Sequence, residues 1–290
     1  MIKFFKLKGI TGVCFLGTLG MLFSCKGDIA EPTVENTVVN SSKRQGNQIS
    51  AIYNTRSVNW DNLSDGTYST SEASTDFGNI TGWDETNMYN SGGTARVKLL
   101  KDALTSAGGI VANVDISDGS EYEVQFDVKF HSQFDWSKGG KVGFGFRIGD
   151  GNTGCDKADD GNGGSARMMW YNSNGEIKFK PYLYYKDMPD NCGSGFGSIY
   201  PSSGSLQKET WYTIKIYVKS NTGTNTNGWV RFTVNGTTVL DRTIRWTTND
   251  AKRLINTMAF STFRGGSSSD WQSSTDGYIY FDNLSWTKIN

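Results

Sequence analysis

A strict alternation of apolar and polar residues, repeated over many short segments, is the feature that most constrains the fold. It is clearest in residues 122–131, whose apolar members are Tyr122, Val124, Phe126, Val128 and Phe130. It recurs over residues 212–218. Because successive side chains of a strand point to opposite faces, each such segment is predicted to be a strand with one buried face.

The remaining body repeats this pattern with few helix signals. The other strand-like segments are 95–100, 110–116, 141–148, 165–171, 178–186, 211–219, 229–235, 237–242, 258–263 and 278–286. Asn235-Gly236 between two of them is a hairpin turn signal. Only residues 249–255 look helical. With 35 glycines and four prolines, the chain is predicted to be all-β, an antiparallel β-sandwich of the jelly-roll type.

The N-terminus reads as a targeting segment. Lys3, Lys6 and Lys8 precede a short apolar stretch, residues 9–23, which is followed by Ser24 and Cys25. This resembles a bacterial lipoprotein signal, in which Cys25 is lipidated; an ordinary secretory signal is the alternative. Lipid chains would tether the protein to a membrane without a spanning segment. We expect the bacterial cell envelope, as an outer-membrane lipoprotein, or secretion.

Three regions are therefore expected: a signal at 1–25, a flexible linker at 26–55 and one catalytic domain at 56–290. The linker is rich in Asn, Ser, Thr and Glu, with no aromatic residue before Tyr53. The chain has 29 basic and 29 acidic residues, and removal of a signal that holds three lysines and no acids leaves it slightly acidic. This argues against nucleic acid as a partner, because such binding needs a strongly basic footprint. We expect a monomer.

The segment 178–186 is unusual among these strands, because one face is cationic and phenolic. Its side chains are Lys178, Lys180, Tyr182, Tyr184 and Lys186. Amines and phenols move protons near neutral pH once their pKa values are tuned. The segment predicts a groove that holds an anion, against the plainer interpretation of a solvated edge strand.

Two preceding segments extend this face. Residues 141–148 place Lys141, Gly143, Gly145 and Arg147 outward, and the glycines suggest a groove floor approached by a ligand or another backbone. Residues 165–171 place Ser165, Arg167 and Met169 on one side.

Arginine suits a planar carboxylate, because its fork donates two parallel hydrogen bonds. We infer a concave, positively charged cleft. His131, on the polar side of its strand, either lines the same groove or is a surface histidine.

The cysteines outside the signal are Cys155 and Cys192. Both fall in loops beside the cationic segments, and an oxidising compartment favours a disulfide between them. Two cysteines and the single His131 do not make a zinc site. The loop Gly149–Gly164 is rich in Gly, Asp and Asn, and is either a flexible rim or a calcium loop. We expect no metal and no cofactor.

Several short segments together resemble polysaccharide lyase family 14, over roughly residues 83–290. The matching pieces are Gly139-Gly140-Lys141, Ser165-Ala166-Arg167-Met168-Met169-Trp170, Tyr182-Leu183-Tyr184, Thr262-Phe263-Arg264-Gly265-Gly266 and Tyr280-Phe281-Asp282-Asn283. The family includes alginate and glucuronan lyases with a jelly-roll fold. The resemblance implies the same fold and an acidic polysaccharide as substrate.

The resemblance also implies roles. Lys141 matches the catalytic lysine, Ser165 and Arg167 match a Ser-x-Arg motif, and Tyr182 and Tyr184 match a tyrosine pair. From the strand pattern, the further candidates for substrate binding are Ser165, Lys178, Lys180, Arg147 and His131. Ser165 could equally be a structural hydrogen-bond donor. Val142-Gly143-Phe144 follows the lysine where the alginate lyases tend to have Leu-Pro-Gly, which bears on substrate preference.

The expected reaction is β-elimination within a 4-linked polyuronate, endo-acting, with alginate first and glucuronan second. Arg167, with Lys180, would neutralise the substrate carboxylate, since stabilisation of developing charge is usually the largest catalytic contribution. Tyr184 or Lys141 would remove the C5 proton, and Tyr182 or the other would protonate O4. A non-catalytic glycan-binding surface lipoprotein is the main alternative. A glycoside hydrolase fits less well, because hydrolases rely on two carboxylates.

Overall fold

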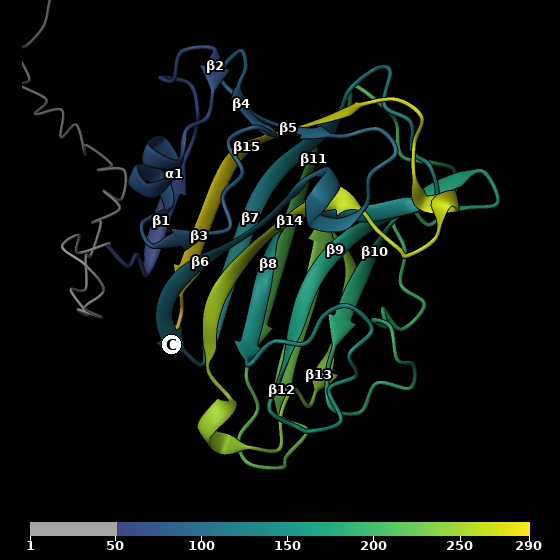
Figure 1. The fold of residues 1–290 in the computed structure, drawn as a ribbon. Helices are drawn as coiled ribbons and strands as arrows, with labels where there is room; N and C mark the ends of the chain where they lie inside the picture. Colours follow the sequence, from purple (N-terminus) through teal and green to yellow (C-terminus); the bar gives the residue numbers. More distant parts are fainter. Residues whose placement is uncertain (1–50) are drawn as a thin grey trace, which may run out of the picture. The chain divides into compact units, whose positions relative to one another are not determined.

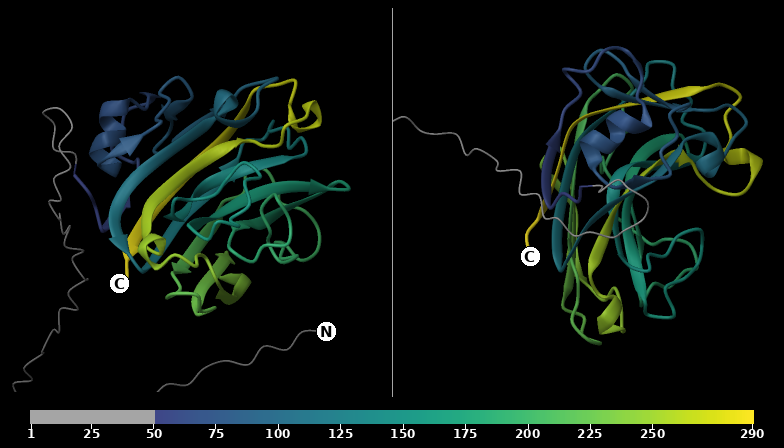
Figure 2. Two further views of the ribbon diagram at one scale, coloured as in Figure 1. Left: turned by 60° about the horizontal axis from the view of Figure 1, so that its bottom comes forward. Right: turned by 60° about the vertical axis from the view of Figure 1, so that its left-hand side comes forward.

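The computed structural model describes residues 51–290, which form two antiparallel sheets packed face to face (Figures 1 and 2). All strand pairs are antiparallel, and the core lies between the sheets. The predicted all-β jelly-roll sandwich is confirmed. Within these residues no helix has the length and apolar character to cross a bilayer.

One sheet has nine strands, in the order β13-β12-β11-β7-β15-β5-β4-β2, with β1 paired to β15. Their bounds are β1 Thr55–Val58, β2 Gly66–Thr67, β4 Met88–Asn90, β5 Ala95–Leu99, β7 Glu121–Phe130, β11 Tyr212–Lys219, β12 Gly228–Val234, β13 Thr237–Ile244 and β15 Gly277–Lys288.

The other sheet has six strands, in the order β10-β9-β8-β14-β6-β3. Their bounds are β3 Ile80–Thr81, β6 Ile110–Gly119, β8 Gly139–Gly149, β9 Gly163–Ser173, β10 Glu176–Tyr184 and β14 Ile255–Arg264. The three cationic segments are therefore the neighbouring strands β8, β9 and β10, as Figure 1 shows.

Local turn chemistry explains how one predicted hairpin closes. β12 ends at Val234 and β13 begins at Thr237, which leaves Asn235 and Gly236 as the turn. Their φ angles are 50° and 75°. Both values lie in the left-handed region that Asn and Gly adopt most readily, which confirms the predicted Asn-Gly turn.

The prediction that Gly143 forms part of an outward groove floor is wrong. The pairing of β8 with β9 shifts register between Val142 and Phe146, which marks a bulge. Gly143 has φ 75°, and a Cβ there would lie 2.2 Å from the ring of Phe126 in the core. At Gly145 a Cβ would meet the carbonyl oxygen of Ala166 at 2.2 Å. Both glycines serve packing within the protein.

The helix prediction also needs correction. Residues 249–255 contain only a 3₁₀ turn, Asp250–Lys252, whereas the α-helix α1 spans Thr70–Phe77. Ser69 caps α1: its Oγ accepts from the amide of Glu72 at 3.2 Å, and the Glu72 carboxylate accepts from the amide of Ser69 at 2.8 Å. This capping box was readable in the sequence. The helix is short and buries only Ala73 and Phe77, so it shows little apolar periodicity.

The expected linker at 26–55 is shorter than predicted at its C-terminal end. The carbonyl of Ala51 accepts from the amide of Asn79, and that of Asn54 accepts from the amide of Lys288. Residues 51–55 thus belong to the folded body. The signal segment, Cys25 and the rest of the linker lie outside the described residues.

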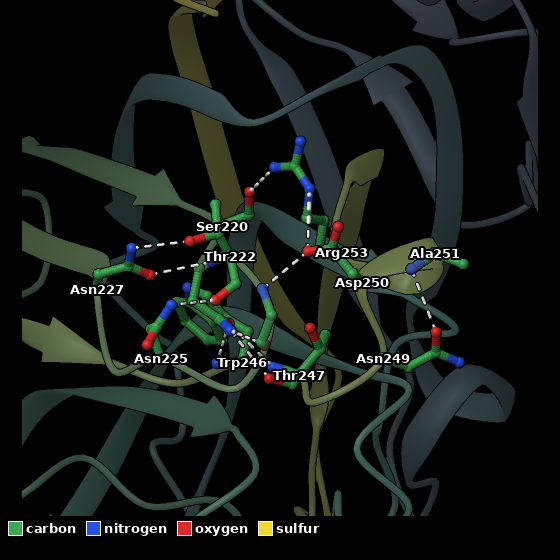
Figure 3. Close-up of polar contacts among 12 residues, drawn as sticks. Ser220, Thr222, Asn225, Asn227, Trp246, Thr247, Asn249, Asp250, Ala251 and Arg253 are labelled. Atoms are coloured by element: carbon green, nitrogen blue, oxygen red, sulfur yellow. Dashed lines mark hydrogen bonds and ion pairs between the residues drawn. The ribbon is translucent and has the colours of Figure 1, made fainter.

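A cluster of polar contacts links two loops (Figure 3). Asn227 exchanges two hydrogen bonds with Thr222, and the guanidinium of Arg253 lies 3.5 Å from the carboxylate of Asp250. Asp250 also accepts from the amide of Gly223 at 2.8 Å. These contacts tie the loop after β11 to the turn before β14. Because these polar groups hydrogen-bond or form ion pairs with one another, we assign the cluster a structural role.

Gly143→Ala is expected to destabilise the protein by about 1–3 kcal/mol, because its Cβ would overlap the buried Phe126 ring and its φ is positive. The measurement is the free energy of unfolding in urea. Gly223→Ala is the matched control, since Gly223 has φ 53° with no atom within 4 Å of the added Cβ. Equal losses in the two variants would contradict a packing role for Gly143.

Candidate active site

Strand register brings the predicted residues together in rows across the six-stranded sheet. Lys141 of β8 pairs with Met169 of β9, which pairs with Lys180 of β10. One step along, Arg167 pairs with Tyr182. Cross-strand partners lie on the same face, so these side chains share the outward face.

A third row completes the arrangement. Arg147 of β8 pairs with Ser165 of β9, which pairs with Tyr184 of β10. The cations and phenols predicted for one face therefore converge on one patch. We refer to Lys141, Arg147, Ser165, Arg167, Met169, Lys180, Tyr182 and Tyr184 as the cationic site.

Arg167 is the electrostatic centre of this site. Only 6% of the residue is exposed, and its Nε and Nη2 are buried without a hydrogen-bond partner. Burial lowers the pKa of its guanidinium to about 10, which leaves it charged at neutral pH. Among residues 51–290 no carboxylate forms an ion pair with Arg167, Arg147 or Lys141. Buried charges are normally paired, so this cation is prepared for an external anion.

Lys141 lies beside it and is 8% exposed. Burial, together with the charge of Arg167, lowers the pKa of Lys141 from 10.5 to about 7. Its Nζ lies 3.7 Å from the centre of the Tyr182 ring, a contact that favours the ammonium form. A cation–π contact contributes about 0.5–2 kcal/mol, whereas burial shifts a pKa by as much as 3–5 units. Burial therefore prevails, and part of the Lys141 population is a neutral amine at neutral pH.

The two tyrosines form the opposite side of the site. Their ring centres are 5.7 Å apart, and the Arg167 guanidinium carbon lies 5.6 Å from each ring. Burial, and then the neighbouring Tyr184 phenol, raise the pKa of Tyr182. Tyr182 is therefore a protonated phenol that can donate. The Tyr184 hydroxyl accepts a hydrogen bond from the backbone amide of Cys155 at 2.8 Å.

The predicted disulfide Cys155–Cys192 is present and borders this site. The amide of Cys155 contacts Tyr184. Gly193, which follows Cys192, packs on the ring of Tyr182. A Cβ on Gly193 would lie 2.5 Å from the Tyr182 ring. The disulfide thus joins two loops that each contact one tyrosine. The sequence alone could not predict these contacts, because they depend on the paths of both loops.

The remaining side chains of the cationic site differ in how firmly other groups of the protein hold them. The Ser165 hydroxyl donates to the carbonyl of Asn152 at 2.7 Å, so it anchors the loop after β8. Arg147 is half-buried with an unpartnered Nε, and burial lowers its pKa. Lys180 lies with its Nζ 4.6 Å from the centre of the Tyr171 ring. Met169 sits between Lys141 and Lys180; alternation placed it on this face, but its apolar character gave no reason to assign it a role.

Lys178 and His131 do not join this group. Lys178 is 3% exposed, and its Nζ donates to the carbonyls of Pro201 and Gly204 and pairs with Glu176. It secures a loop. His131 follows β7, which pairs with β11 and β15 in the other sheet. The expectation that it could line the same groove is wrong, because strand alternation reveals the face of a strand and not its sheet.

Two acidic side chains of the loop Gly149–Gly164 form ion pairs with lysines. Asp150 pairs with Lys252, and Asp159 with Lys157. Across residues 51–290, no group of three or more His, Cys, Asp or Glu side chains is arranged to hold a metal ion.

Comparison with known proteins gives a consistent picture. The family model described as polysaccharide lyase 14 matches residues 91–284. The chain is 30% identical to the exolysin of Paramecium bursaria Chlorella virus 1 over 167 residues, which cover 49% of this chain and 25% of that protein. The chain thus spans about a quarter of the length of this curated relative.

Solved structures extend the match. Alginate lyase Aly36B is 58% identical, with a TM-score of 0.82, over 83% of this chain and 99% of that chain. Aly36B variants with a lysine and a tyrosine, or a lysine and a methionine, replaced by alanine were solved with an alginate tetrasaccharide and trisaccharide. The alginate lyase of Aplysia kurodai, 21% identical with a TM-score of 0.61 over 80% of this chain and 98% of that chain, shares the fold.

The lowered pKa of Lys141 predicts a pH-dependent stability. The unfolded chain keeps this lysine protonated to about pH 10, whereas the folded chain releases the proton near pH 7. Since the unfolded state binds more protons between these values, stability rises with pH there, by about 5 kcal/mol over the full range. Unfolding of the native chain and of Lys141→Met, measured across this range, isolates the effect. Parallel pH dependences would show that Lys141 titrates normally.

Proposed function

Because the chain belongs to polysaccharide lyase family 14, we propose that it cleaves an anionic 4-linked polyuronate by β-elimination, with alginate as the substrate. The observation that carries this proposal is the buried Arg167, which has no carboxylate partner among the described residues 51–290, next to a lysine with a pKa of about 7. A cation to hold a carboxylate and an amine to take a proton are the two groups that the reaction requires.

Similarity to Aly36B supports alginate over glucuronan. Aly36B is 58% identical, and its variants were captured with alginate oligosaccharides. The variants replace a lysine together with a tyrosine or a methionine, and the cationic site here contains Lys141, Tyr182, Tyr184 and Met169. The substrate class is the same for both polymers, since each carries one carboxylate per sugar.

Neutralisation of the substrate carboxylate is the first requirement. The C5 proton is weakly acidic while the adjacent carboxylate keeps its full charge. Arg167 can donate two parallel hydrogen bonds to that carboxylate, and the Tyr182 phenol, which holds its proton, lies across from it in the register. In a water-poor site these donors stabilise the developing negative charge strongly.

Proton transfer is the second requirement. The neutral amine of Lys141 takes the C5 proton, the C4–O4 bond breaks, and a C4–C5 double bond forms. O4 then receives a proton from Tyr182, or from the Lys141 ammonium itself. The second route requires H5 and O4 to lie on the same side of the sugar ring. Since the Lys141 Nζ lies 3.7 Å from the centre of the Tyr182 ring, both residues border the same part of the site, and the structure is compatible with either donor.

A non-catalytic glycan-binding role explains the arrangement less well. Binding alone would use charged lysines, and would not require Lys141 to be buried beside Arg167, where its pKa falls to about 7. A hydrolase is disfavoured because the cationic site contains no aspartate or glutamate among its members.

We also propose that the protein is a cell-envelope lipoprotein anchored through Cys25. The motif Leu22-Phe23-Ser24-Cys25 supports this. Cys25→Ser is expected to move the protein from the membrane fraction to the soluble fraction of the host bacterium. Retention of the variant in the membrane fraction would contradict the lipid anchor.

The full chain is expected to raise the ultraviolet absorbance of alginate solutions, because the product carries a conjugated unsaturated uronate. Lys141→Ala should lower turnover about 10²–10⁴-fold. Tyr182→Phe should cost as much if Tyr182 protonates O4, and only about tenfold if Lys141 does. The acidic limb of kcat/KM should lie near pH 7, with activity rising as Lys141 loses its proton.

Lys215→Ala is the matched control, since Lys215 lies in the nine-stranded sheet and pairs with Glu123 at 2.9 Å. It should leave turnover unchanged. Glucuronan is tested in parallel to decide the polymer. Binding of alginate without any absorbance change would refute the lyase and favour a glycan-binding protein.

A further inference from the structure

The outward face of the nine-stranded sheet carries a second set of aromatic and cationic side chains, remote from the cationic site. Tyr89 of β4 pairs with Arg96 of β5, which pairs with Tyr280 of β15, which pairs with Lys129 of β7. Trp211 continues the line, with its ring centre 5.0 Å from the Lys129 Nζ. We call these five residues the aromatic–cation row.

The row runs perpendicular to the strands, with aromatic and cationic residues in strict alternation. Each step equals the strand separation, about 4.8 Å, which is similar to the length of one 4-linked pyranose residue. The four strand residues of the row are partly exposed while their immediate neighbours in the strands are buried, and Trp211, just before β11, is exposed. The row is thus a surface feature of the sandwich.

The charges in the row are incompletely satisfied. Within residues 51–290, Arg96 has no carboxylate at ion-pair distance and its Nε has no hydrogen-bond partner. Its guanidinium carbon lies 4.8 Å from the Tyr89 ring centre and 5.1 Å from that of Tyr278. Lys129 lies 3.8 Å from Glu209, which is half exposed, a weak pair in water.

His131 adds an imidazole ring beside this row. Its centre lies 6.1 Å from the Tyr280 ring and 5.8 Å from the Tyr278 ring. Lys98, which pairs with Tyr278 in the sheet, forms an ion pair with Asp276 at 3.0 Å, so the charge of Lys98 is already neutralised. The available positive charge is therefore concentrated on Arg96 and Lys129.

We propose that the aromatic–cation row is a second polyuronate-binding site, which holds a polymer chain that the active site is not cleaving. This inference rests on the proposed function for the identity of the polymer. Pyranose rings present an apolar C–H face that packs on aromatic rings, and each uronate adds one carboxylate for a cation. At one sugar per strand step, every second sugar can pack on an aromatic ring, and the sugars between them can each present a carboxylate to Arg96 or Lys129.

The position of the row separates it from catalysis. The hydrophobic core lies between the two sheets, and the row and the cationic site lie on opposite outer faces. A tetrasaccharide that fills the active site therefore cannot reach the row. A long polymer, or a gel of many chains, can occupy both sites and so retain the enzyme near its substrate.

The test is polymer binding by the full chain in the Lys141→Ala background, with the active site saturated by alginate tetrasaccharide. Arg96→Gln/Lys129→Gln is expected to weaken binding of polymeric alginate about tenfold, and Trp211→Ala to weaken it several-fold. In the otherwise native chain the same changes should raise KM for the polymer and leave turnover of the tetrasaccharide unchanged.

Lys215→Gln/Arg231→Gln is the matched control, because it removes two cations from the same sheet outside the row. Equal polymer binding by the row variant and this control would overturn the second site. Failure of the proposed function looks different: the native chain would cleave neither substrate. If the row variant still lost polymer binding in that case, the row would stand as a glycan-binding site without the lyase.

Discussion

The pairing register of β8, β9 and β10 is the constraint on which the site depends. A shift of one residue between β9 and β10 would turn Tyr182 and Tyr184 toward the core and replace them with Leu183. The register is held by what lies behind the sheet, where Phe146, Trp170 and Leu183 are fully buried. The same hydrophobic packing that stabilises the sandwich therefore sets the distances between the cation, the amine and the phenols.

Much of this could be predicted from the sequence because alternation is a local property. It assigned Lys141, Arg167, Tyr182 and Tyr184 to one face, and the register places them together. What failed depended on distant parts of the chain. The bulge at Gly143 makes room for the Phe126 ring of the other sheet. Lys178 is hydrogen-bonded to a loop more than twenty residues away in the sequence. The strand order determines which sheet His131 borders.

The pKa of Lys141 was likewise beyond local prediction. The strand pattern placed cations beside this lysine, but the dominant cause of its lowered pKa is burial, with the charge of Arg167 second. Burial here comes from neighbouring strands and from the segment after β14, since a Cβ on Gly265 would lie 3.7 Å from the Lys141 Nζ. A solvent-exposed lysine in the same register would stay protonated and could not accept a proton at neutral pH.

Arg167 then resolves a conflict inherent in this chemistry. A substrate carboxylate entering a buried site would attract a proton to Lys141 and raise its pKa, which would remove the base at the moment it is needed. The paired register of Arg167 with Tyr182 places a permanent cation and a neutral donor where that carboxylate can be neutralised instead. One buried guanidinium can thus both acidify the C5 proton and keep Lys141 able to receive it. This is why the lack of a carboxylate partner for Arg167 within residues 51–290 is the informative feature of the site.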